Sequence, residues 1–394
     1  MKNKIQFPLM RNNILKNDFN VLIKFLKKKP ILTQNKNVKN FEEKWSKWLG
    51  VKYSVFVNSG SSANLLQIQL LKMQYPKGGE VIVPAFTWSS DISSLLHCGF
   101  TPVFADIDLE TLGLNTDLII SKINKNTKAI FLSYIQGFNC LTEKLLKVLK
   151  KKKIHLIEDV CESHGAKFKN KKLGSFGWTS SFSFYYAHHM STIEGGMICT
   201  DDKKTYHNLL MLRSHGMVRE VKDNKFQKYI KNKYKDLNTQ FIFKFPAYNV
   251  RNTEIGGVLG LEQIKRLDKN IAKRNKNFEY FINRLDKDIF FTNFDLTGHS
   301  NYAFNVILKN KNHKLMNKIL QNLEKEGIEF RRGSAGGGNQ LRQPYLKDFV
   351  SKKDIKELKN TEHIHFFSFY IGNYPELTSK KIDKIVKTLN IVTI

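Results

Sequence analysis

Short apolar runs alternate with helical patterns along the N-terminal half of the chain, and most runs are followed by polar residues. The runs that we expect to form strands are residues 53–57, 80–83, 102–106, 129–133, 154–158 and 181–184. Because these short runs are separated by helical segments, they predict an α/β fold with a mostly parallel sheet covered by helices on both faces. Ligands bind such sheets at the carboxyl ends of the strands, so the residues that follow the runs are the first candidates for a site.

The pattern changes near residue 250, where longer charged helices begin. We expect helices over residues 254–277, 311–326 and 377–389, with short strands between them. The chain is also too long for one small core. We therefore predict an N-terminal arm and large domain at residues 1–250, with the ligand site in the large domain, and a smaller C-terminal α+β domain at residues 251–394.

The chain is strongly basic, with 65 Lys and Arg against 35 Asp and Glu and a net charge of +30. A basic surface can bind the phosphate backbone of nucleic acids. Lysines are spread over the whole length, however, and neither zinc-finger spacing nor an RNA-binding aromatic motif is present in the sequence. We interpret the charge as a solvated surface that helps to attract a small anionic substrate, and we expect no nucleic-acid partner.

The sequence gives no indication of a membrane or metal partner. No apolar run approaches the roughly 20 residues that span a bilayer, and the N-terminus lacks a leader pattern. We therefore expect a cytoplasmic protein with no membrane partner. The widely spaced cysteines also predict neither disulfides nor a metal site, because no C-x-x-C pair occurs. These cysteines are Cys98, Cys140, Cys161 and Cys199.

A small turn at Gly60 and Ser61 follows the first expected strand and opens an apolar helix. Free backbone N–H groups at a helix start favour a phosphate, and a glycine lets the phosphate approach the backbone closely. A serine-rich turn can equally be a simple helix N-cap. The turn alone leaves both interpretations open.

Two further polar or aromatic positions follow expected strands. Asp159 ends the run IHLIED, where a carboxylate either caps the strand or binds a cationic ligand. Trp88, in VPAFTWSSD, either packs in the core or forms a flat apolar lid over a ligand ring. Both residues are candidates for a site at the carboxyl edge of the sheet.

The run SSFSFYYAHHMSTIEGG at residues 180–196 places two histidines before a Glu-Gly-Gly turn. It resembles the lysine segment of the DegT/DnrJ/EryC1/StrS sugar aminotransferases, in which the lysine amine holds pyridoxal phosphate covalently. Counting from Ser183, the lysine position is His188, and His189 is expected to be structural. An imidazole lacks the primary amine for this link, but its ordinary pKa of about 6.5 suits it to move protons. The motif also departs from the family at Ile193, where glycine is usual.

The resemblance extends over about residues 30–373 and implies a fold type I pyridoxal-phosphate transferase with a large domain and a smaller one. It implies noncovalently bound pyridoxal 5′-phosphate or pyridoxamine 5′-phosphate, and a homodimer with shared active sites. Asp159 would pair with the ring nitrogen of the cofactor, and Glu162 would lie near the ring oxygen in place of the usual glutamine. Asn249 would reach the phosphate of the cofactor that is bound in the partner subunit. The implied cofactor-binding residues are Gly60, Ser61, Trp88, Asp159, Glu162, Ser183 and Asn249.

A second group of residues is implied by the resemblance to face a nucleotide-linked sugar. These residues are Leu32, Thr33, His215, Arg219, Arg251 and Glu329. Arginines suit a diphosphate because they form paired hydrogen bonds. The glycine-rich segment GSAGGGNQLRQPY at residues 333–345 looks like a loop that closes on the substrate, and the roles of Arg331 and Arg332 stay open.

Within the family, His188 and Glu162 resemble the lysine-lacking 3-dehydratases of nucleotide-linked 4-keto-6-deoxyhexoses, which include the enzyme of colitose biosynthesis. This implies a lyase that uses His188 as acid and base and makes dideoxysugars for lipopolysaccharide O-antigen. GDP is the expected nucleotide and CDP the alternative. Some relatives regenerate the amine form of the cofactor with an iron–sulfur reductase and others with glutamate, and the cysteine spacing favours glutamate.

Three other interpretations remain open at this point. The chain could be a nucleotide-sugar aminotransferase that uses another lysine, such as Lys167 or Lys169. It could be a non-catalytic cofactor-binding homologue. It could also be a basic nucleic-acid binder, which predicts steeply salt-dependent DNA binding.

Overall fold

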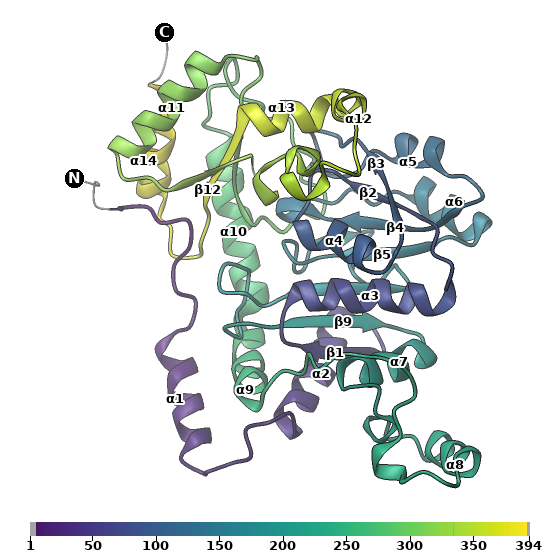
Figure 1. Ribbon diagram of the computed structural model, residues 1–394. Helices are drawn as coiled ribbons and strands as arrows, with labels where there is room; N and C mark the ends of the chain where they lie inside the picture. Colours follow the sequence, from purple (N-terminus) through teal and green to yellow (C-terminus); the bar gives the residue numbers. More distant parts are fainter. Residues whose placement is uncertain (1–4, 334, 392–394) are drawn as a thin grey trace.

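The computed structural model describes residues 5–333 and 335–391, and its centre is a seven-stranded sheet (Figure 1). The strand order is β1-β9-β8-β5-β4-β2-β3. The strands are β1 (Tyr53–Val57), β2 (Glu80–Pro84), β3 (Thr101–Ala105), β4 (Thr127–Ser133), β5 (His155–Asp159), β8 (Thr179–Ser183) and β9 (Gly196–Thr200). Within these strands β9 alone runs antiparallel to its neighbours β1 and β8, whereas the pairs from β8 to β3 are parallel. The mostly parallel sheet predicted from the sequence is therefore confirmed.

Helices cover both faces of this sheet because successive strand residues point to opposite sides. Ile82 and Ile130 pack into one core with Trp45 of α2 (Lys36–Leu49). Val81 directly precedes Ile82, and Phe131 directly follows Ile130, so both point to the opposite face of the sheet. There they pack into another core with side chains of α3 and α4. The helices of the large sheet are α2, α3 (Gly60–Gln74), α4 (Ser89–His97), α5 (Thr116–Lys122), α6 (Glu143–Lys152) and α7 (Lys203–Arg213).

A smaller sheet of order β10-β12-β11 lies in the C-terminal part of the chain. Its strands are β10 (Ala303–Ile307), β11 (Phe330–Arg332) and β12 (Ser368–Gly372). It shares an apolar core with surrounding helices, and Phe7 of the N-terminal segment joins that core. The helices in this half of the chain are α8 (Asn224–Lys233), α9 (Glu254–Gln263), α10 (Leu267–Ile282), α11 (His313–Lys325), α12 (Lys352–Glu357), α13 (Lys359–Phe367) and α14 (Ser379–Asn390). The domain division at residue 250 stays a prediction.

The helix expected over residues 254–277 is divided in the structure. A 3-10 turn at Ile264–Arg266 separates α9 from α10, which continues to Ile282. The backbone of Arg266 (φ −113°, ψ 1°) leaves the α-helical region, so the hydrogen-bond ladder changes there. The prediction of a single helix was wrong because tertiary contacts of Arg266 decide the local geometry.

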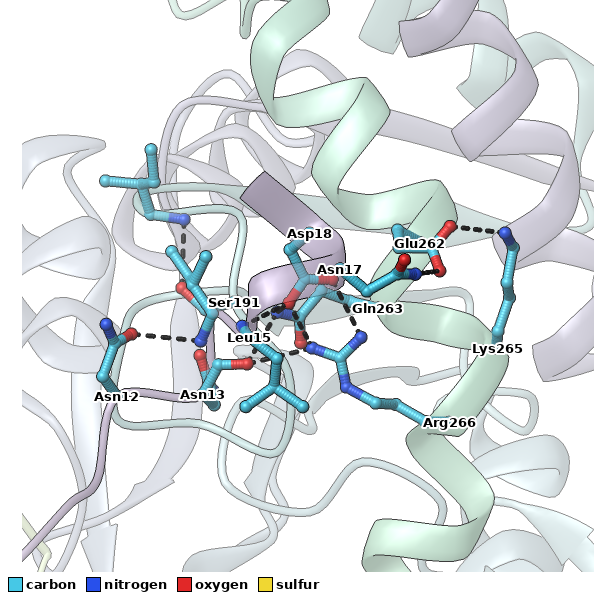
Figure 2. Close-up of polar contacts among 12 residues, drawn as sticks. Asn12, Asn13, Leu15, Asn17, Asp18, Ser191, Glu262, Gln263, Lys265 and Arg266 are labelled. Carbon is cyan, nitrogen blue, oxygen red and sulfur yellow. Dashed lines mark hydrogen bonds and ion pairs between the residues drawn. The ribbon is translucent and has the colours of Figure 1, made fainter. Parts of the chain in front are cut away.

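Those contacts attach the N-terminal helix α1 (Lys16–Leu26) to the end of α9 (Figure 2). Arg266 Nη1 donates to the buried Asp18 carboxylate at 2.8 Å, and its Nη2 donates to the Asn13 carbonyl at 2.9 Å. The Gln263 side chain donates to the same carbonyl at 3.0 Å. Asn13 Nδ2 in turn donates to the carbonyl of His188 at 3.3 Å. The arm therefore connects α9 with the loop that carries the two histidines.

Two antiparallel two-residue strands, β6 (Lys167–Phe168) and β7 (Lys171–Lys172), form a small separate sheet. In the part of the chain that the structure describes, no helix is both long and apolar enough to cross a bilayer.

Candidate active site

A cavity of about 390 Å³ lies where the carboxyl ends of the central strands meet the C-terminal part of the chain. It is lined by residues from β4, β5 and β8 of the large sheet and from β11 and β12 of the small sheet. Seven of the residues singled out from the sequence line it, namely Gly60, Ser61, Trp88, Asp159, Glu162, Ser183 and His188. The expected position of the site at the carboxyl edge of the sheet matches this cavity.

The start of α3 forms one end of the cavity. Ser59 caps the helix, and its hydroxyl accepts from Ser62 N at 3.0 Å. A Cβ atom added to Gly60 would lie only 2.6 Å from Ser183 Cβ, so no larger residue fits at this position. Gly60 and Ser61 line the cavity in the first helical turn, where backbone N–H groups have no intrahelical partner. This cradle fits a phosphate group.

Asp159, the last residue of β5, lies buried at the cavity wall. Its oxygens accept hydrogen bonds from Asn64 Nδ2 and from Cys161 N, each at 2.8 Å. The carboxylate is thus fixed in orientation, and it lines the same cavity as the phosphate cradle. A buried carboxylate in this place fits a cationic ring nitrogen.

Glu162 lies one turn beyond Asp159 and has an unusual protonation equilibrium. Burial, opposed by a hydrogen bond from Gln136 N and supported by the charge of Asp159, raises the pKa of Glu162 to about 7. That bond is 3.0 Å long. Glu162 can therefore hold or release a proton near neutral pH, as acid–base catalysis requires.

His188 lies in the loop between β8 and β9 and lines the cavity. Loss of water and, to a smaller extent, the positive charge of Arg274 lower the pKa of His188 to about 3. Its Nδ1 atom is buried and has no hydrogen-bond partner among the described residues. The imidazole is therefore neutral at physiological pH, and Nδ1 is a buried polar atom that a ligand could engage.

His164, His188 and His189 lie close together with their rings nearly parallel. The ring centroids of His164 lie 6.1 Å from His188 and 5.3 Å from His189. His189 is buried and contacts the Ser300 carbonyl through Nε2 at 3.2 Å, in agreement with a structural role. Burial also lowers the pKa of His164 and His189 well below 6.5, so this group packs as neutral rings.

Trp88 lines the cavity from the loop before α4 and keeps 54% of its surface exposed. Its exposure disfavours the alternative of simple core packing. A flat ring can therefore cover a planar ligand from this side.

The other predicted residues do not line this cavity within one chain. Glu329 lines an adjoining hollow and accepts a hydrogen bond from Leu9 N at 2.8 Å. Asn249 and Arg251 are linked to each other by a 3.0 Å side-chain hydrogen bond. Arg219 lies 5.3 Å from the ring of Phe241. The residues outside both hollows are Leu32, Thr33, His215, Arg219, Asn249 and Arg251.

Several cavity residues were not found from the sequence. They are Asn64, Asp91, Ser133, Tyr302 and Tyr370. Arg331, whose role the sequence left open, lines the cavity, whereas Arg332 does not line it and donates to the Phe366 carbonyl at 3.4 Å. The tyrosines belong to a distant part of the chain and stand in no recognisable motif, so only the tertiary fold brings them to the site.

The glycine-rich segment 333–345 borders the cavity through Ala335 and Gly336. Ser334 lies outside the described residues. Gln340 N donates to the Ala85 carbonyl at 2.9 Å, and a β-bridge pairs Asn339 with Phe86. The segment is thus attached to the strand end that precedes Trp88.

The cavity offers a phosphate cradle at α3, a buried carboxylate at Asp159 and a neutral imidazole at His188, and no lysine lines it in the described chain. Lys169 forms an exposed ion pair with Glu143, its Nζ atom lying 2.6 Å from Oε2. Neither Lys167 nor Lys169 lines the cavity. The arrangement can hold a phosphorylated ring and move protons, but in the described residues it offers no amine for a covalent link.

Comparison with known proteins places these features in a family. The model of the DegT/DnrJ/EryC1/StrS aminotransferase family matches residues 12–390. The GDP-4-keto-6-deoxy-D-mannose 3-dehydratase of Escherichia coli O55:H7 is 34% identical over 364 residues, which cover 91% of this chain and 93% of the relative.

Solved structures agree with this likeness. E. coli GDP-4-keto-6-deoxy-D-mannose-3-dehydratase with bound hydrated PLP superposes with a TM-score of 0.88 at 32% identity, covering 98% of this chain and 100% of the other. A GDP-4-keto-6-deoxymannose-3-dehydratase with a trapped PLP-glutamate geminal diamine gives a TM-score of 0.86 at 32% identity, with coverages of 98% and 100%.

The buried histidines predict a pH-dependent stability. The folded state keeps His164 neutral because its pKa is lowered, whereas the unfolded chain binds a proton below about pH 6.5. Stability should therefore fall as the pH decreases below this value, by up to about 1.4 kcal/mol per pH unit from this residue. Urea unfolding between pH 7.5 and 4.5 should show a smaller decrease for His164→Phe than for the wild type. Parallel curves for the two proteins would contradict the assignment.

Proposed function

The chain belongs to the DegT/DnrJ/EryC1/StrS aminotransferase family, and we propose that it is a pyridoxamine-phosphate-dependent 3-dehydratase of a nucleotide-linked 4-keto-6-deoxyhexose. The observation that carries this proposal is His188, a half-buried, neutral imidazole that lines the cavity within the segment that resembles the family's lysine segment. Without an amine from the protein, the cofactor amine stays free to act on the sugar. The relatives named as 3-dehydratases support this chemistry over that of an aminotransferase.

The residues of the cavity would hold the cofactor noncovalently. Gly60, Ser61 and Ser183 would bind its phosphate, Asp159 its ring nitrogen, and Trp88 would cover the ring. When bound, pyridoxamine phosphate supplies the amine that condenses with the sugar 4-ketone and the conjugated ring that accepts electrons as the 3-hydroxyl leaves. The charge of Asp159 beside the ring nitrogen favours the protonated, electron-accepting ring.

His188 would move the protons of the reaction. It would take the proton at the cofactor C4′ carbon and then assist departure of the sugar 3-hydroxyl as water, once the negative charges of the bound cofactor and substrate raise its pKa from about 3 toward neutral. Glu162, with its pKa raised to about 7, can accept or return a proton beside the ring. Trp88 and the 333–345 segment would exclude water from the reacting atoms.

The substrate would be a GDP-sugar, with a CDP-sugar as the alternative, because the similar enzymes are named for a GDP-sugar. Glutamate would restore the amine form of the cofactor, as the PLP-glutamate adduct of a similar structure supports. The sugar then loses one oxygen atom, and glutamate becomes 2-oxoglutarate and ammonia, which balances atoms and electrons. The net charge of +30 favours the approach of such anions.

The active form would be a homodimer with shared sites. One stripe of α1 carries apolar side chains that are exposed in the single chain. They are Leu15 (43% exposed), Phe19 (48%), Ile23 (50%) and Leu26 (38%). Their spacing of four, four and three residues places them on one helical face, and exposed apolar patches of this kind mark protein interfaces. A partner subunit would also explain why His215, Asn249 and Arg251 do not line the cavity of their own chain.

A charge placed on the α1 stripe should break the dimer. We expect sedimentation velocity to show a dimer for the wild type and a largely monomeric species for Phe19→Asp, because an ionised side chain cannot be buried unpaired. Lys24→Glu on the opposite face of α1 is the matched control and should remain dimeric. A monomeric wild type, or a Phe19→Asp dimer as stable as the wild type, would argue against this interface.

The proposed reaction can be tested with three substrates in parallel. The enzyme is incubated with pyridoxamine phosphate, glutamate and a GDP-, CDP- or dTDP-4-keto-6-deoxyhexose, and products are measured by mass spectrometry. We expect a sugar that has lost one oxygen atom and one 2-oxoglutarate for each sugar converted. His188→Asn should reduce the rate by about 10²–10⁴-fold, the usual contribution of a general acid–base group, whereas His189→Asn should retain most activity. An amino sugar as the product would instead identify an aminotransferase, and no conversion would favour a non-catalytic homologue.

A further inference from the structure

A second buried carboxylic acid lies beside Asp159 at the cavity wall. Asp91 belongs to the first turn of α4, directly after the Trp88 loop, and its exposed fraction is 0% against 6% for Asp159. Both residues line the cavity. An acid in the first turn of a helix normally stabilises the helix dipole at the surface, so its complete burial against another acid needs a different explanation.

One amide group bridges the two carboxyl groups. Asn64 Nδ2 lies 2.7 Å from Asp91 Oδ1 and 2.8 Å from Asp159 Oδ2, so its two hydrogens serve both acids. Asp91 Oδ2 also accepts hydrogen bonds from the hydroxyls of Thr87 and Ser133, and the bond from Ser133 is 2.5 Å long. In the described residues no ion pair joins Asp91 or Asp159 to a Lys, Arg or His side chain.

Electrostatics does not allow both acids to be ionised in this place. Two carboxylates that share a buried site repel each other strongly, and one of them takes up a proton. Burial raises the pKa of Asp91 well above its ordinary value, and the neighbouring charge of Asp159 acts in the same direction. The bridging Asn64 amide holds the two carboxyl groups beside each other, so this repulsion cannot be relieved by moving them apart.

We propose that Asp91 and Asp159 share one proton and present a single negative charge to the ring nitrogen of the cofactor. Asp91 is then a positioning residue, because it acts on the cofactor through Asp159. The single charge matches the single positive charge of a protonated ring nitrogen, whereas two negative charges would leave an unpaired buried anion. The identity of the facing ring rests on the proposed function, but the shared proton does not.

The groups around the pair are compatible with one shared proton. The titratable side chains around the pair are the Cys161 thiol and the Tyr345 hydroxyl, which respond to the charge of Asp91, and the Glu162 carboxyl group, which responds to the charge of Asp159. Burial raises the pKa of the thiol and of the hydroxyl, so both are uncharged near neutral pH, whereas Glu162, with its pKa raised to about 7, titrates in the wild type and in Asp91→Asn alike. Hydroxyls and an amide make up the remaining bonded partners of Asp91, and they adapt to either protonation state.

Infrared spectroscopy of the cofactor-free protein tests the shared proton directly. Labelling with ¹³C-aspartate separates the aspartate bands from those of the buried Glu158 and the half-buried Glu162. We expect the wild type at pH 7 to show the carbonyl stretch of a protonated aspartic acid, and Asp91→Asn to lose it. Asp18→Asn is the matched control, because Asp18 is equally buried but lies in an ion pair with Arg266, and it should retain the band. A wild type without the band, or an Asp91→Asn protein that keeps it, would overturn the proposal.

Affinity for pyridoxamine phosphate, measured by fluorescence titration from pH 6 to pH 9, gives a second readout. Asparagine mimics the neutral acid, so Asp91→Asn should bind within about threefold of the wild type at pH 7, whereas Asp91→Leu should bind at least tenfold more weakly. As the pH rises, loss of the shared proton should change the affinity of the wild type for pyridoxamine phosphate. Asp91→Asn has no such proton to lose, so this change should be absent from its pH profile. Equal pH profiles for wild type and Asp91→Asn would count against the shared proton. The sugar reaction is not part of either measurement, so its failure would leave this proposal standing.

Discussion

Desolvation at the carboxyl edge of the central sheet governs the protonation state of the candidate active site. The same loss of water lowers the pKa of His188 to about 3 and raises that of Glu162 to about 7. It also raises the pKa of the Asp91 carboxyl group. One physical cause thus keeps the imidazole neutral and the acids partly or fully protonated in one cavity.

The fold creates this desolvated space by joining two sheets and an arm. Strand ends of the large sheet supply Asp159 and Ser183, and the small sheet closes the cavity with Arg331 and Tyr370. The N-terminal arm is fixed by the contact of Asp18 with Arg266 (Figure 2). It also donates a hydrogen bond to the loop of His188. Each of these contacts removes water from the cavity or fixes a group that lines it.

The sequence predicted those parts of the site that lie in local motifs. Gly60, Asp159 and His188 follow strands within long recognisable segments, so their register could be counted from neighbouring residues. Asp91 could not be identified in this way, because an acid in the first turn of a helix has an ordinary electrostatic explanation. Tyr302 reaches the cavity only through tertiary packing. Asn249, which the resemblance assigns to the site of a partner subunit, does not line the cavity of its own chain.

The central claim is that His188 takes the place that the resemblance gives to a cofactor-binding lysine, in a cavity that no lysine of the described residues lines. Intact-protein mass spectrometry after borohydride reduction with pyridoxal phosphate measures this without any sugar substrate. We expect no cofactor on the active-site peptide of the wild type and one covalently attached cofactor per chain at the new lysine of His188→Lys. Stoichiometric labelling of a wild-type cavity peptide, or no labelling at position 188 in His188→Lys, would contradict the account.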